Sequence, residues 1–186
     1  MRNRLTRITT RGGDKGESGL GDGSRHRKTA PHFHALGDID ELNCALGIVV
    51  ANLAVDHPLR AHLIEIQSRL FDLGGAIALP RTAYSLAADV LVLDRLIAEY
   101  NARLGPLANF ILPGGTPAGA QAHFARAVCR RAERSLWELT TACPNDYDES
   151  LAVYLNRLSD VLFVFARVLN EHTPELLWQQ RERKGT

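Results

Sequence analysis

The sequence predicts an all-α protein, a bundle of five helices that follows a glycine-rich N-terminal loop. Apolar residues recur at steps of three and four along five stretches, which is the spacing of amphipathic helices. Proline and glycine separate these stretches, and no alternating pattern is long enough for a useful strand. The length of 186 residues suits one domain, with a loop segment over 1–35, a bundle over 36–172 and a tail over 173–186.

The first two helices are bounded by prolines. We expect the first over about 37 to 54, stopping before Pro58. Its core positions should be Leu42, Leu46, Val49, Val50 and Leu53. The second should begin with Pro58 in its first turn, where a missing amide proton costs nothing, and Pro80 should end it.

The third helix is expected over about 86 to 104, with Ser85 as its N-cap and Gly105 and Pro106 after its end. Its core positions should be Leu93, Leu96, Ile97 and Tyr100. These side chains follow the helical repeat, so one face of the helix should pack on the bundle.

The stretch "FILPGGTPAGAQAHF" marks the start of the fourth helix. A Pro-Gly-Gly turn follows an apolar tripeptide, and Thr116 then stands as N-cap before Pro117 at the first helical position. This helix should run from 117 to about 142. The fifth should run from about 147 to 171, and the polar residues "QQRERKGT" that end the chain are expected to fray.

Composition excludes two broad classes of partner. The 22 basic and 21 acidic residues nearly cancel, so no general attraction to nucleic acid follows, and no apolar run is long enough to span a membrane. Cys44, Cys129 and Cys143 fit no metal-ligand spacing and are expected to be reduced, packed thiols. The arginine-rich start lacks the apolar segment of a signal peptide, so we expect a cytoplasmic protein.

The fourth helix carries an excess of charge in the stretch "RAVCRRAERS" (126–135). At about 100° per residue, one stripe collects His123, Arg126, Arg130, Glu133 and Trp137. The opposite, core face should consist of Phe124, Val128, Ala132 and Leu136. The stripe is either a solvated side with ordinary ion pairs or a binding surface. A large aromatic such as Trp137 favours the second alternative.

The fifth helix repeats this arrangement. Its polar side should carry Asn156, Asp160, Phe163 and Arg167. Its core face should consist of Leu155, Leu158, Leu162, Phe165 and Leu169. Asn156 is a poor mid-helix residue whose amide favours a specific partner, although simple packing against a subunit or water remains an alternative.

The segment "TTRGGDKGESGLGDGSRHRK" (9–28) has the composition of an anion site. Successive glycine amides can point at one anion, and neighbouring Lys and Arg side chains can neutralise phosphate charge. It is neither a Walker A loop nor a dinucleotide fingerprint, because the required spacing and βαβ context are missing. A disordered glycine-rich terminus remains the alternative.

Six features in order carry a family resemblance. They are "TRGGDKGESGL" (10–20), Lys28, "GDIDELNCALG" (37–47), "FILPGG" (110–115), "RAVCRRAER" (126–134) and "YLNRLSDVLFVFAR" (154–167). Together they resemble the corrinoid adenosyltransferases of the propanediol-utilisation type, the ATP:cob(I)alamin adenosyltransferases. The resemblance spans nearly the whole chain and implies a ferritin-like five-helix bundle.

The same resemblance implies a homotrimer with each active site between adjacent subunits and the N-terminal segment closing over ATP. The implied ATP-binding residues are Thr10, Arg11, Gly12, Gly13, Ser18, Gly19, Lys28, Arg130, Arg131, Glu133, Arg134 and Asn156. The implied corrinoid-binding residues are Phe110 and an intersubunit ion pair of Asp40 with Arg126. Arg130, Phe110, Asp40 and Arg126 are the implied catalytic residues. Three departures are His32, Leu36 and Ser18-Gly19, where the family commonly has an arginine, an aromatic residue and a Thr-containing pair.

The implied reaction moves the 5'-deoxyadenosyl group of ATP onto the cobalt of cob(I)alamin and releases triphosphate. Cob(I)alamin is itself the nucleophile, which fits the lack of a Ser/His/Asp or Cys/His constellation. Lys28, Arg130 and Mg²⁺ carried by the ATP phosphates would neutralise the leaving group, with no metal ligand set expected from protein side chains. Phe110 would keep the lower ligand off cob(II)alamin before its reduction.

A reductase and an adenosylcobalamin-dependent mutase are the implied partners. Two other functions stay open from sequence alone. One is an escort that delivers adenosylcobalamin to a mutase, and the other is a helical interaction module with no ligand.

Overall fold

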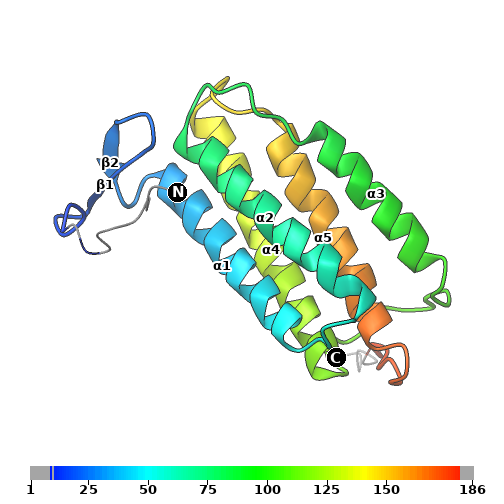
Figure 1. Ribbon diagram of the computed structural model, residues 1–186. Coiled ribbons are helices and arrows are strands. Elements are labelled where there is room, and N and C mark those ends of the chain that lie inside the picture. The colour runs from blue at the N-terminus through cyan, green and yellow to red at the C-terminus, as the bar shows by residue number, and fades with distance from the viewer. Residues whose placement is uncertain (1–8, 10, 181–186) are drawn as a thin grey trace, which may run out of the picture.

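The computed structural model describes residue 9 and residues 11–180, and within them the all-α expectation is confirmed. Five helices lie side by side along one long axis (Figure 1). They are α1 (Pro31–Ala51), α2 (Pro58–Ala78), α3 (Ala87–Asn101), α4 (Pro117–Ala142) and α5 (Ser150–Leu169). Helix α4 packs against both α1 and α5, while α2 covers α1 and α3 covers α5.

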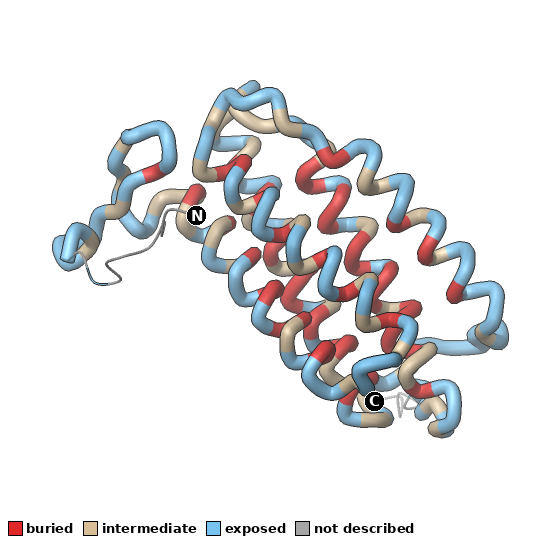
Figure 2. Tube along the Cα trace, in the orientation of Figure 1, coloured by how far each residue is buried: buried red, intermediate tan, exposed pale blue. Residues whose placement is uncertain are grey.

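The core lies between the helices, as Figure 2 shows by the buried stretches on their facing sides. Most of the expected core positions are buried, including Leu42 and Leu46 of α1 and Leu158 and Leu162 of α5. Small residues on α4 such as Ala125 and Ala132 are also fully buried, which lets neighbouring helices approach closely. Within the described residues, no helix combines the length and apolarity that crossing a bilayer requires.

The region before the bundle differs from the expected loop. Helix α1 begins at Pro31, and a small antiparallel hairpin precedes it, made of β1 (Glu17–Gly19) and β2 (Arg25–Arg27). The helix start was missed because its N-cap, Ala30, has no side chain that can cap the helix. The hairpin was missed because strands of three residues are too short to show an alternating pattern.

Two expectations about single side chains are wrong. Leu86 rather than Ser85 occupies the N-cap position of α3, although the Ser85 hydroxyl still accepts a hydrogen bond from the amide of Ala87. Phe124, expected in the core, is 52% exposed. Phe124 lies at the edge of the buried face of α4, which centres on Ala132. Its ring therefore stays outside the contacts between α4 and the neighbouring helices.

The cysteines are free, but Cys44 is exposed and not packed as expected. Cys44 lies on the side of α1 that faces away from the core, so no other described helix covers its thiol. Cys129 is buried and Cys143 is half-buried, as the apolar neighbours of these two residues indicated.

The Pro-Gly-Gly turn before α4 is held by Asn170, the residue that follows α5. The Asn170 Oδ1 atom accepts hydrogen bonds from the amide and the hydroxyl of Thr116, at 2.9 and 3.1 Å, and its Nδ2 donates to the carbonyl of Gly114 at 2.8 Å. Gly115 has a positive φ of 97°, and a Cβ there or at Gly119 would overlap the Asn170 amide. These glycines are therefore required by close packing.

We predict that Gly119→Ala lowers the free energy of unfolding by about 2–3 kcal/mol, because the new methyl group displaces a buried, hydrogen-bonded amide. A Cβ at this position would lie 2.7 Å from Cγ of Asn170. The control is Gly75→Ala in α2, where nothing lies within 4 Å of the added carbon and a small gain in stability is expected. Urea unfolding measures both; equal stabilities would contradict the packing argument.

Candidate functional site

Arg130 of α4 and Asn156 of α5 lie on adjacent outer positions of the two helices. The thiol of Cys129 donates to the carbonyl of Leu155 at 3.2 Å, which fixes the register of α4 against α5 one residue before each of them. Burial raises the pKa of the Cys129 thiol, Glu133 and Asp160 raise it further, and Arg130 lowers it. Arg130, Glu133 and Asp160 therefore lie close enough to Cys129 to act on its thiol, where α4 meets α5.

Arg130 and Glu133 take part in no ion pair among the described residues, and Arg130 is exposed. Arg134 is also exposed. Because no carboxylate of the described part of the chain pairs with it, the guanidinium of Arg130 is available to an anion that approaches this surface.

Arg131 differs from its neighbours because its guanidinium binds helix α1. Its Nε lies 3.1 Å from a carboxylate oxygen of Asp38, and its Nη2 pairs with Glu41. The hydroxyl of Ser135 also donates to Asp38. Arg131 therefore joins α4 to α1 within the chain.

The N-terminal hairpin brings several of the predicted loop residues together. The guanidinium of Arg25 donates to the carbonyl of Gly12 at 2.8 Å, and the amide of Lys28 donates to the carbonyl of Gly16 at 2.9 Å. The Lys28 ammonium lies so close to Gly13 that a Cβ built there would be 3.0 Å from Nζ. Glycines and the cationic side chains of Arg25 and Lys28 thus lie on the same small structure.

The other predicted loop residues lie on or beside this hairpin. Ser18 and Gly19 lie in β1, and Arg11 has a positive φ of 58° just before the turn. Thr10 lies outside the described residues. No described contact joins the hairpin to Arg130 or Asn156, so the predicted nucleotide ligands form two separate groups within the described residues.

Phe110 and Arg126 line one apolar cavity of about 570 Å³, together with Phe163 of α5. Phe110 is 79% exposed, so its ring is presented to the surface of the chain and does not fill the core. Arg126 is half-buried, and its Nε is buried with no hydrogen-bond partner among the described residues. A buried donor without an acceptor costs free energy, so a partner from outside the described residues would stabilise it.

Asp40 lies in a second, smaller cavity of about 290 Å³ between α1 and α2, beside Leu36 and Phe71. It makes no ion pair with Arg126 among the described residues, and the two line different cavities. A pair between them would therefore need a second copy of the chain.

Sequence reasoning missed the contacts of the C-terminal segment, which was expected to be a tail from 173 with fraying over 179–186. The amide of Leu112 donates to the carbonyl of Leu176, and the amide of Trp178 donates to the carbonyl of Phe110, both at 2.7 Å. The Trp178 ring also meets the Phe110 ring edge-on at 6.4 Å. The segment around Leu176 and Trp178 therefore supports the strand-like stretch that carries Phe110; residues 181–186 lie outside the described part.

Arg167 anchors this segment. The expectation that it lies on the polar, outward side of α5 is wrong. Arg167 is 7% exposed, binds Glu175 at 2.8 Å through Nε and donates to the carbonyl of Gly105. His123 was also expected on the polar stripe, but it is buried, and its ring meets Phe163 of α5 edge-on. Burial and the nearby Arg126 lower the pKa of His123, while Glu175 opposes them. Glu175, which follows α5 in the sequence, is the feature from which the ion pair with Arg167 could have been predicted.

Over the described residues, no group of three or more His, Cys, Asp or Glu side chains is arranged to hold a metal ion. The cationic and apolar surfaces instead suit an anionic ligand and a large apolar one. Arg130 and the hairpin cation would meet the first, and the cavity of Phe110 the second.

A family model described as cobalamin adenosyltransferase matches residues 8–169. The chain belongs to the cobalamin adenosyltransferase family. It is 50% identical over 187 residues to a cobalamin adenosyltransferase of Cupriavidus metallidurans, covering 100% of both chains. It is 43% identical to a corrinoid adenosyltransferase of Mycobacterium tuberculosis, covering 94% of each chain.

A solved structure shares the fold of this cobalamin adenosyltransferase. It is a variant of the PduO-type ATP:corrinoid adenosyltransferase from Lactobacillus reuteri complexed with cobalamin and ATP. The TM-score is 0.87 at 31% identity, covering 93% of this chain and 97% of that chain. The chain is thus an enzyme, an adenosyltransferase of the family that acts on cobalamin.

Proposed function

We propose that the chain transfers the 5'-deoxyadenosyl group of ATP to cob(I)alamin at a site formed between adjacent subunits of a homotrimer. The observation that carries the shared site is the buried Nε of Arg126, which lacks a partner among the described residues while Asp40 lies in a separate cavity. A neighbouring copy would bring Asp40 to Arg126 and close the cavity of Phe110. One corrinoid would then lie between the two surfaces.

In this proposal ATP binds Arg130, Glu133 and Asn156 with its phosphates covered by the glycine-rich hairpin. Arg130 and Lys28 would stabilise the triphosphate as negative charge grows on the leaving oxygen. The guanidinium of Arg130 suits this task because its planar fork can bind two phosphate oxygens at once. Arg11, Gly12, Gly13, Ser18 and Gly19 would supply amides and side chains to the same phosphates, and Thr10 would join them. Arg134 remains a candidate at the edge of this surface.

The corrinoid would lie against Phe110. Its exposed ring, backed by Trp178, offers an apolar wall that excludes water and the lower ligand from the cobalt of cob(II)alamin. Reduction to cob(I)alamin is easier without that ligand. The resulting cob(I)alamin attacks the ribose 5' carbon, the carbon–oxygen bond to triphosphate breaks, and no protein nucleophile is used.

We assign Mg²⁺ to the phosphates of ATP, because the described side chains offer no metal ligand set. We also place the enzyme in the cytoplasm, for which its free thiols are the supporting observation. A reductase that supplies cob(I)alamin and a mutase that uses adenosylcobalamin complete the proposed partners.

An anaerobic single-turnover assay tests the function. Chemically reduced cob(I)alamin and ATP are mixed with the enzyme, and the cobalt spectrum and triphosphate are followed together. Formation of both products at the same rate supports the transferase. Tight binding of adenosylcobalamin with no triphosphate would instead indicate an escort protein.

We predict that Arg130→Ala lowers the single-turnover rate by about ten-fold or more, because the leaving group loses a bidentate cation. The matched control is Arg95→Ala, which removes an exposed arginine of α3, away from the proposed ATP surface. The thermal midpoint of both variants should stay near that of the wild type, since neither residue makes an ion pair among the described residues. Wild-type rates for Arg130→Ala would remove this residue from the mechanism.

Phe110→Ala should slow adenosylation from cob(II)alamin with a reductant more than adenosylation from supplied cob(I)alamin. The reason is that the ring acts on the lower face of cobalt before reduction and does not act on the transfer itself. Both assays use the same enzyme preparation, so a loss of folded protein would affect them equally. Equal losses would therefore contradict the proposed wall.

Mixed trimers test the intersubunit pair. Asp40→Ala and Arg126→Ala should each be poorly active alone, because every site lacks one partner. Random co-assembly of the two should restore native pairs at about one quarter of the sites, since each site takes one residue from each of two neighbours. Separately tagged subunits confirm the mixing. No recovery of activity in verified mixed trimers would exclude a shared pair.

A further inference from the structure

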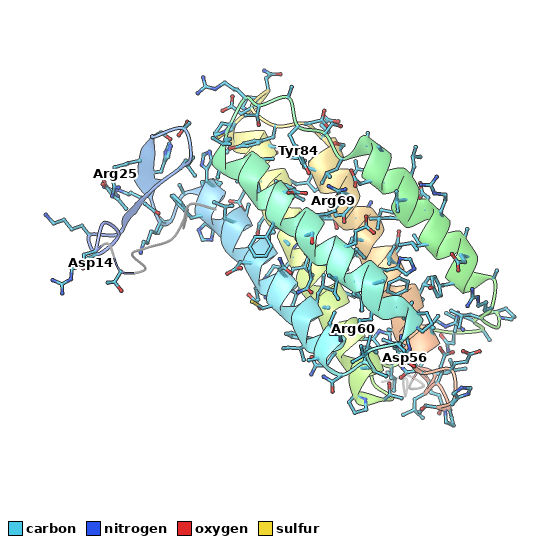
Figure 3. The ribbon with its side chains drawn as sticks, viewed as in Figure 1. Asp14, Arg25, Asp56, Arg60, Arg69 and Tyr84 are labelled. Carbon is cyan, nitrogen blue, oxygen red and sulfur yellow. The ribbon has the colours of Figure 1, made fainter. Side chains whose placement is uncertain are left out.

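The hairpin of β1 and β2 is joined to the helices by few contacts. It projects beyond the end of α1 (Figure 1), and the labelled Asp14 and Arg25 stand away from the bundle (Figure 3). Figure 2 shows most of it exposed, with short intermediate stretches. Its one buried residue is Leu20, and the amide of Gly21 donates to the carbonyl of Ala78 at 2.7 Å. Any further contact therefore contributes a large share of its docking.

That further contact is a pair of stacked imidazoles. The rings of His26 in β2 and His32 in the first turn of α1 lie 5.1 Å apart with an angle of 21° between their planes. His32 is 8% exposed. On its other sides it meets the ring of Tyr147 edge-on at 6.2 Å, and its Nε2 lies 3.8 Å from the thiol of Cys143. His32 is thus enclosed between the hairpin and the loop that joins α4 to α5.

The orientation of the His26 ring is fixed from within the hairpin. The hydroxyl of Ser24 donates to a carboxylate oxygen of Asp22 at 2.6 Å and lies 3.0 Å from Nε2 of His26. Because the single hydroxyl proton goes to Asp22, Nε2 of His26 is the donor to the Ser24 oxygen. These hydrogen bonds hold the His26 ring with its face toward His32, so the stack is the contact that His26 makes outside the hairpin.

We propose that His26 and His32 are positioning residues, which dock the nucleotide hairpin on the bundle by stacking and do so only while His32 is uncharged. The proposal rests on the proposed function, in which this hairpin covers the ATP phosphates. Lys28 follows β2 directly, so the stack also sets where its ammonium group stands. A proton on His32 would add a charge at the stacked face and inside an enclosed site.

The charges around His32 agree with this requirement. Burial lowers the pKa of His32 and the neighbouring His26 lowers it further, while Asp146 and Asp22 oppose the shift. Arg81 lies 3.8 Å from Asp146 and offsets part of that carboxylate's effect. Burial raises the pKa of both Tyr147 and Cys143, so these two neighbours stay neutral near pH 7.

The sign of the pH effect follows. The docked state holds His32 with a lowered pKa, so the undocked state binds the proton more readily. Docking is therefore strongest above the ordinary histidine pKa of about 6.5, and it weakens as pH falls below that value.

The first experiment measures docking without ATP. Full-length wild type, His32→Ala, His32→Phe and His26→Ala are digested briefly with trypsin at pH 8, and cleavage after Arg25 and Arg27 is measured by mass spectrometry. We expect His32→Ala and His26→Ala to be cut several-fold faster there, and His32→Phe to resemble the wild type because a ring still stacks. Equal cleavage of wild type and both alanine variants would overturn the docking contact. His26 lies in the hairpin, so its variant leaves the bundle's own packing unchanged.

The second experiment measures positioning by the KM for ATP between pH 8 and pH 6. In the wild type KM should rise several-fold at pH 6 with kcat at saturating ATP largely kept. His32→Phe should lose most of that rise, and His32→Ala should show a high KM throughout. The same rise in His32→Phe, or an unchanged KM in His32→Ala, would refute the proposal. If the wild type made no triphosphate, the proposed function would fail, whereas the trypsin result would still decide docking.

Discussion

The side chain of Asn170 ties together the ends of the two helices that carry the proposed site. Its amide binds Thr116 and Gly114 at the start of α4 while its backbone ends α5. This junction fixes how far α4 advances along α5, and the Cys129 thiol on the Leu155 carbonyl sets the same register further along. The positions of Arg126, Arg130 and Asn156 relative to one another follow from these contacts, because rigid helices transmit the register of one end along their length.

The arginines separate into two groups by what holds them. Arg131 and Arg167 are bound by carboxylates of the same chain and hold α1 and the C-terminal segment in place. Arg130 is exposed and has no such partner over residues 11–180, so a ligand phosphate would displace no ion pair of that part of the chain. Arg126 is intermediate, because a buried Nε without a partner costs free energy until something binds it. A second subunit or a ligand that accepts a hydrogen bond from this Nε would remove that cost, which would favour its binding.

Periodicity was enough to predict five helices and most of the core, because helical burial repeats locally and leaves a mark every three or four residues. The errors fall where burial depends on residues far apart in the chain. His123 is buried because Phe163 lies against it and the Arg167–Glu175 pair holds the last segment nearby. His123 and Phe163 are too far apart in the sequence for a local pattern to include both. Phe110 was identified by resemblance, but its support by Trp178 could be seen only once the chain was folded.

The weakly attached hairpin also explains why a small contact can matter for substrate affinity. A segment with little buried surface opens at low free-energy cost, and the apparent affinity for a ligand that needs it closed falls with the closed fraction. Mutations in the core of such a protein change stability while leaving this fraction nearly constant. A change at the His26–His32 stack acts on the closed fraction directly. If the hairpin covers ATP as proposed, affinity for ATP and stability of the fold would depend on different residues, and the first could be tuned without loss of the second.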